Sequence, residues 1–115
     1  MRSLFLPVVG GVAVLLGAPA SVVVAQGVSG TGTAERALLD RYCVTCHNER
    51  LQVAELTLDT IDVTDVGAHA DVWEKVVRKL RAGAMPPAPR PRPDPDTYAA
   101  FTTWLERELD AAAAA

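Results

Sequence analysis

The side chains with the clearest chemical potential form one short cluster, Cys43-Val44-Thr45-Cys46-His47. Cys43 and Cys46 are the only two cysteines of the 115-residue chain. They stand three positions apart and His47 follows directly, a C-x-x-C-H spacing that is typical of c-type haem attachment. Each thiol of such a motif can bond to one vinyl group of the porphyrin, and the imidazole becomes the proximal ligand of the iron. The cluster therefore predicts one covalently bound haem c.

Two other chemistries use the same residue types. A disulfide or a thioredoxin-like redox pair also fits C-x-x-C, but the redox pair needs a βαβ context that is not visible here. A bridge over three positions closes a very small loop and gives little entropic stabilisation. A structural zinc ion needs four ligands. Cys43, Cys46, His47 and His69 are the candidate set, and the adjacent Cys46 and His47 fit one tetrahedron poorly. The spacing favours haem over both.

A second iron ligand is predicted at Met85, the only methionine besides Met1. It stands before Pro86 and Pro87, and prolines reduce the freedom of a loop before it folds, so less entropy is lost in fixing it. Ligation by His and Met raises the haem potential and suits electron transfer. The alternatives are that Met85 only fills a gap in the core, or that His69 is the second ligand. His69 stands at the start of a predicted helix, where a solvated surface position is the simpler expectation.

Three helices are expected to position these residues, over 34–42, 68–81 and 97–109. In the second, Val72, Val76 and Leu80 recur every fourth residue and form an apolar stripe. Asp94 and Pro95 look like the N-cap and first residue of the third helix. Thr33 is the expected cap of the first, and Gly83 is the expected stop signal after the second. The sequence therefore predicts an all-α fold.

The connecting segments are expected to be irregular. Residues 48–66 alternate apolar and polar side chains, but one short strand would have no partner, so a loop against the haem edge is favoured. Residues 84–93 contain five prolines. This composition excludes a helix or a central strand and predicts an extended segment near polyproline II.

The N-terminal region reads as an export signal. Residues 1–25 carry one basic residue, then an apolar stretch, and end with small residues at Val23 and Ala25, as in a signal peptide cleaved after residue 25. An uncleaved membrane anchor is the alternative, since residues 4–25 have no charge and are long enough to span a bilayer. The expected organisation is a signal peptide at 1–25, a flexible linker at 26–33, a helical domain at 34–110 and a low-complexity tail at 111–115. The expected location is the periplasm.

The charges bear on possible partners. Without Arg2, 10 of the 11 basic residues remain against all 14 acidic ones, and no basic patch interleaved with aromatic residues suggests nucleic-acid binding. A run of basic residues brackets Met85 in sequence and could form a positive rim for an acidic redox partner; a solvated face is the alternative. The run comprises Arg78, Lys79, Arg81, Arg90 and Arg92.

These motifs resemble the single-haem cytochrome c family, and over residues 38–109 the likeness is closest to the planctomycete-type cytochrome c domain. The similar stretches are residues 42–48, the run Val72-Trp73-Glu74-Lys75-Val76, and Gly83-Ala84-Met85-Pro86-Pro87. The resemblance implies an all-α cytochrome c-like fold in which the first and last helices cross beside the haem. It also implies specific roles: Cys43 and Cys46 form the thioether bonds, His47 is the proximal ligand and Met85 the distal ligand.

The expected function is single-electron transfer in the periplasm, with no catalytic residues, because no candidate general base stands out. The alternatives are a haem enzyme or gas-sensing domain with a labile sixth ligand, or the N-terminal haem module of a larger exported oxidoreductase. In the family that the chain resembles, the domain is often the leading part of a longer protein. We therefore expect a monomer or one module of a larger protein. A membrane association is expected only if residues 1–25 are retained.

Overall fold

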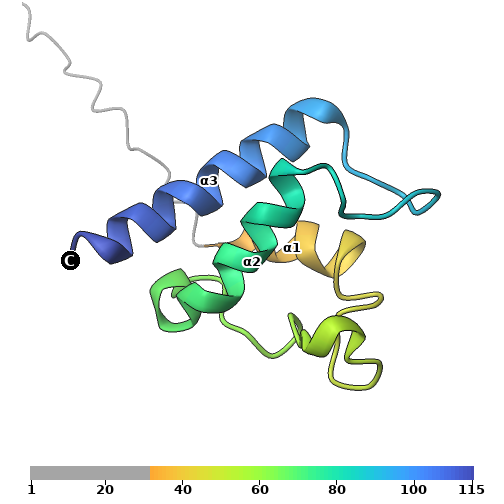
Figure 1. Ribbon diagram of the computed structural model, residues 1–115, viewed down its shortest axis with the longest axis horizontal. Coiled ribbons are helices and arrows are strands. Elements are labelled where there is room, and N and C mark those ends of the chain that lie inside the picture. The colour runs from red at the N-terminus through yellow and green to blue at the C-terminus, as the bar shows by residue number, and fades with distance from the viewer. Residues whose placement is uncertain (1–31) are drawn as a thin grey trace, which may run out of the picture.

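The computed structural model describes residues 32–115 and contains three α-helices within that range (Figure 1). They are α1 (Thr33–Tyr42), α2 (Ala70–Arg81) and α3 (Pro95–Ala113). Two short 3₁₀ helices, η1 (Val53–Glu55) and η2 (Val66–His69), lie in the long connection between α1 and α2. Residues 32–115 form no strand, so the all-α prediction is confirmed. The predicted signal peptide at 1–25 and the linker up to residue 31 lie outside the described residues.

The start of α1 depends on a glycine rather than on the predicted threonine cap. Gly32 is the N-cap, with a left-handed φ of 67°, and Thr33 is already helical. A Cβ atom at Gly32 would lie 2.9 Å from Thr64 Cγ2 and 3.2 Å from Val63 Cγ1. Glycine is required here both for the backbone conformation and for this close approach. The predicted linker at 26–33 is therefore wrong at its last residue, because Thr33 belongs to α1.

The second helix begins two residues later than predicted, because η2 precedes it. The Asp65 side chain accepts a hydrogen bond from the Ala68 backbone N–H at 3.1 Å and so begins the 3₁₀ turn. At the other end, Gly83 has a φ of 64°. The backbone N–H groups of Gly83 and Ala84 donate to the carbonyls of Leu80 and Lys79. This is the Schellman arrangement that glycine favours after a helix, as expected from the stop signal at Gly83.

The third helix is longer than the sequence predicted. Asp94 caps it, accepting from the Thr97 backbone N–H at 2.9 Å, and Pro95 takes the first position, as expected. The helix then continues to Ala113, so the low-complexity tail at 111–115 is largely helical. Alanine has the highest helix propensity. A Cβ atom at Gly67 would lie 2.9 Å from the Ala112 Cβ, so the end of α3 packs closely on η2.

Replacement of Asp94 by asparagine is expected to lower the melting temperature at neutral pH by a few degrees. Hydrogen bonds from the Thr97 side chain and backbone lower the pKa of the Asp94 carboxyl below its usual 3.8. A lowered carboxyl pKa stabilises the folded state above the unfolded pKa, and this stabilisation is lost as the pH falls through the folded value. Melts of wild type and variant should therefore converge below about pH 3.8. The control is Asp96→Asn in the same helical turn; an equal effect there would contradict the assignment.

The core is built by all three helices together with the long connection. α2 packs on α3, and η2 packs on both. The irregular segment 48–66 contributes three buried apolar side chains, so its apolar pattern serves the core rather than a strand. The buried apolar residues are Leu39, Leu58, Val63, Val66, Trp73, Leu80, Phe101 and Leu105. No helix within residues 32–115 is both long and apolar enough to cross a membrane.

Candidate functional site

The C-x-x-C-H cluster forms a tight turn at the end of α1. The Cys43 backbone N–H donates to Leu39 O at 2.8 Å and so completes the helix. The backbone N–H groups of Cys46 and His47 then both donate to Cys43 O, at 3.1 and 2.9 Å. The turn brings the side chains of Cys43, Cys46 and His47 to the wall of the same cavity. The sequence spacing is thus realised as one compact group.

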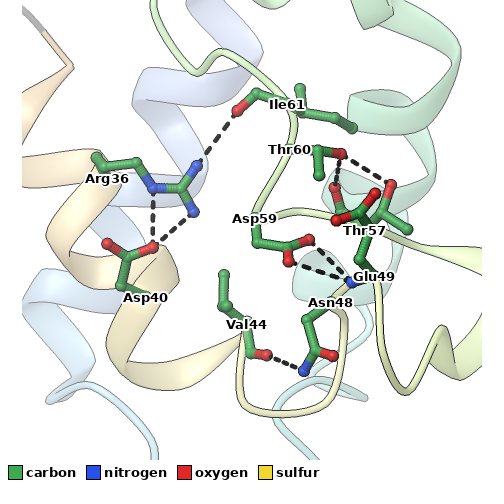
Figure 2. A network of polar contacts seen from close by, with 9 residues as sticks. All are labelled: Arg36, Asp40, Val44, Asn48, Glu49, Thr57, Asp59, Thr60 and Ile61. Carbon is green, nitrogen blue, oxygen red and sulfur yellow. Dashed lines mark hydrogen bonds and ion pairs between the residues drawn. The ribbon is translucent and has the colours of Figure 1, made fainter.

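The residues after the turn are held by side chains that bond to the backbone (Figure 2). Asn48 Nδ2 donates to Val44 O at 2.6 Å, which bonds the chain back to the C-x-x-C-H turn. The Asp59 carboxylate accepts from the Glu49 backbone N–H at 3.1 and 3.2 Å. The Leu58 N–H donates to His47 O at 2.9 Å. These bonds fix the backbone on both sides of His47 without occupying its imidazole.

Among the described residues, the imidazole of His47 has a hydrogen-bond partner at only one of its two nitrogens. Its Nδ1 atom lies 2.7 Å from Val53 O. A carbonyl oxygen can only accept, so Nδ1 is the donor, and in the neutral tautomer that this bond selects the lone pair lies on Nε2. Histidines that ligate metals are commonly oriented in this way, by a backbone carbonyl on the other ring nitrogen. The structure therefore leaves His47 Nε2 available as a ligand atom.

The Val53 carbonyl is presented by a strained turn. Gln52, Ala54 and Glu55 have φ values of 47°, 56° and 58°. Left-handed conformations are unfavourable for residues other than glycine and persist only where the surroundings enforce them. Sequence reasoning missed this turn because no glycine marks it.

Replacement of Ala54 by glycine is expected to raise the free energy of unfolding by about 1 kcal/mol, because glycine adopts a positive φ without a Cβ penalty. Chemical denaturation of the purified protein measures this difference. Ala99→Gly is the matched control on the exposed face of α3, where the same change should destabilise by about 1 kcal/mol. Destabilisation by both variants would contradict the strained turn.

Met85 belongs to the segment between α2 and α3, residues 82–94. Its backbone carbonyl lies 2.7 Å from the Tyr98 hydroxyl, which also lies 2.9 Å from Leu80 O. The segment is not a straight polyproline helix as predicted, because the Arg90 N–H donates to Pro87 O at 2.8 Å and closes a turn. The Met85 side chain is half-buried and lines the same cavity as the C-x-x-C-H cluster.

The cavity that these segments enclose has a volume of about 860 Å³, which is within the range of cofactor and ligand sites. One wall is the apolar stripe of α2 that the sequence predicted, Val72, Val76 and Leu80. Another comes from Leu56 and Leu58. Five basic side chains and two acidic ones also line it: Arg41, Lys75, Arg78, Lys79 and Arg90, with Glu55 and Asp71. This basic excess contrasts with the net charge of −3 of the whole chain.

Several residues that the sequence singled out lie elsewhere. His69 is exposed and does not line the cavity. Trp73 is fully buried in the core, and its indole N–H has no hydrogen-bond partner among the described residues.

Two members of the predicted basic run lie away from the cavity. Arg81 forms a bidentate ion pair with Glu106, and Arg92 does not line the cavity. The predicted basic run therefore supplies only Arg78, Lys79 and Arg90 to the rim.

Cys43 and Cys46 are both free thiols. Burial raises the pKa of the Cys43 thiol to about 11, against a smaller opposing effect of Arg36. Reactive and metal-binding cysteines instead need a stabilised thiolate. Within residues 32–115, no group of three or more His, Cys, Asp or Glu side chains is placed to hold a metal ion. Neither a thiol redox centre nor a zinc site gains support from this arrangement.

Comparisons of the chain with protein-family models, with curated proteins and with solved structures give no match.

Proposed function

We propose that this chain is a c-type cytochrome that transfers single electrons through one covalently bound haem. The observation that carries the proposal is that Met85 lines the same cavity as Cys43, Cys46 and His47, although it lies far from them in the sequence. Their chemistry fits the group: two thiols for thioether bonds, a free imidazole nitrogen and a thioether sulfur for the iron. The apolar walls suit a porphyrin.

Each residue has a distinct role in this proposal. Cys43 and Cys46 attach the group, and the burial that raises the Cys43 pKa does not oppose a thioether, which carries no charge. His47 would offer Nε2, held by the bond from Nδ1 to Val53 O. Met85 would offer its sulfur. The haem supplies the one-electron chemistry, and the protein orients, shields and tunes it.

A cytochrome c-like fold is part of the same proposal. Leu38 and Tyr42 of α1 and Tyr98 and Phe101 of α3 line one small crevice, which also includes Cys43. Residues of the first and last helices therefore border the residue that would attach the haem. The resemblance to cytochromes c implies a crossing of these helices beside the haem, and their shared crevice supports that proposal.

The basic excess around the cavity supports an acidic protein as redox partner. Charges of one sign around a cleft steer an oppositely charged partner and raise the association rate at low salt. The propionates of a bound haem would offset part of this charge. Export to the periplasm, through the predicted signal peptide at 1–25, is also part of the proposal. The haem would be attached there, and the protein would exchange electrons with other exported proteins.

Production of the full chain in a host with c-type haem maturation tests the proposal. We expect a red product whose mass includes one haem and whose ferric spectrum is low-spin. We also expect the ferrous protein to resist carbon monoxide at neutral pH, since His47 and Met85 would both ligate the iron. Rapid stoichiometric binding of carbon monoxide would instead indicate a labile sixth ligand and favour the enzyme or gas-sensor alternative.

A further inference from the structure

Arg92 bonds to the backbone of the segment that carries Met85 at three points. Its Nε atom donates to Pro86 O at 2.7 Å. Its Nη2 atom donates to Gly83 O at 2.5 Å and to Met85 O at 3.2 Å. The guanidinium also lies over the Tyr98 ring, 5.4 Å from the centroid. One side chain thus connects both sides of Met85 to the start of α3.

The segment has few other means of holding its shape. Five of residues 84–93 are prolines, which have no backbone N–H to donate. Among the described residues, its only internal backbone bond runs from Arg90 to Pro87 O. The carbonyls of Gly83, Met85 and Pro86 therefore depend on side-chain donors. A planar guanidinium with five N–H groups can serve several carbonyls at once, whereas a lysine ammonium is a single point.

We propose that Arg92, stacked on Tyr98, is the positioning residue that holds Met85 in place as the sixth ligand. The proposal rests on the proposed function. Arg92 does not line the cavity and acts only through the backbone on both sides of Met85. Tyr98 supports the same carbonyl, with its hydroxyl 2.7 Å from Met85 O. The pair thereby decides whether an external ligand can displace Met85.

The test uses the holoprotein and imidazole as a competing ligand. Imidazole displaces a methionine from ferric iron, and the loss of the sulfur–iron absorption band reports it. We expect Arg92→Gln to bind imidazole at least about tenfold more tightly than wild type. The variant loses hydrogen bonds donated by a charged group, and the net free energy of such bonds corresponds to a factor of this size in a dissociation constant. The band should also disappear on heating before the far-ultraviolet circular dichroism of the helices, whereas in wild type the two should change together.

Two further variants separate geometry from charge. Arg92→Lys keeps the charge but cannot span three carbonyls, so we expect its imidazole affinity to approach that of Arg92→Gln. Arg107→Gln removes the same charge from the exposed surface of α3, and we expect it to titrate like wild type. If Arg92→Gln does not fold, Arg92→Lys decides the matter by the same titration. A lysine variant that behaves like wild type overturns the proposal.

The outcome also distinguishes this proposal from the proposed function. If Arg92→Gln and wild type bind imidazole equally while Met85→Ala binds it far more tightly, the role of Arg92 is overturned and ligation by Met85 stands. If Met85→Ala also binds imidazole like wild type, ligation by Met85 is itself wrong, and the role of Arg92 falls with it.

Discussion

Replacement of both Cys43 and Cys46 by alanine is expected to abolish covalent haem attachment completely. The two thiols are the only cysteines of the chain, and both line the cavity, so no other side chain can form the thioether bonds. Wild-type protein should keep its colour after denaturation and acid extraction, and its intact mass should include one haem. The double variant should have the mass of the polypeptide alone.

Each single cysteine variant provides an internal comparison, because one thioether bond can still form and should shift the haem spectrum. Wild-type chain from a host without haem maturation is the second control and should also be colourless. Small domains often need a bound group for stability, and this one has a cavity of about 860 Å³ that the proposed haem would fill. We therefore expect the colourless forms to show less helical circular dichroism. Pigment that survives denaturation in the double variant would contradict attachment through Cys43 and Cys46.

The second large effect is expected from Met85→Ala. Loss of the thioether sulfur should remove the sulfur–iron absorption band and lower the reduction potential by at least about 0.1 V, within the span of about 0.8 V that axial ligands cover. The ferrous variant should also bind carbon monoxide, because its sixth position is open. Spectroelectrochemistry of the purified variant measures the first two effects.

The matched control for Met85→Ala is His69→Ala. His69 is exposed and lies away from the cavity, so its loss should leave the spectrum and the potential unchanged. A Met85→Ala protein with an unaltered spectrum would refute the distal ligand. A changed spectrum in His69→Ala would point to ligation by two histidines.

How far the sequence predicts the elements depends on whether their signals are local. The α2 stripe, the Asp94 cap with Pro95, and the Gly83 stop are each set by residues within one or two helical turns, and all three are confirmed. The prediction that Thr33 caps α1 was wrong. The N-cap is Gly32, which Val63 and Thr64 approach closely from far along the chain. The length of α3 was underestimated because the alanine tail gains a contact at Gly67.

The sequence by itself determined the candidate chemistry, because the C-x-x-C-H spacing and the single methionine after residue 1 are properties of the chain order. Only the tertiary structure decided that Met85 and the cluster share one cavity and that His69 does not. It alone identified the hydrogen bonds that hold the candidate ligands, from His47 to the Val53 carbonyl and from Arg92 to the backbone around Met85. The reason is physical: a backbone carbonyl is present at every residue, so no side-chain pattern shows which one a distant donor will reach until the chain has folded.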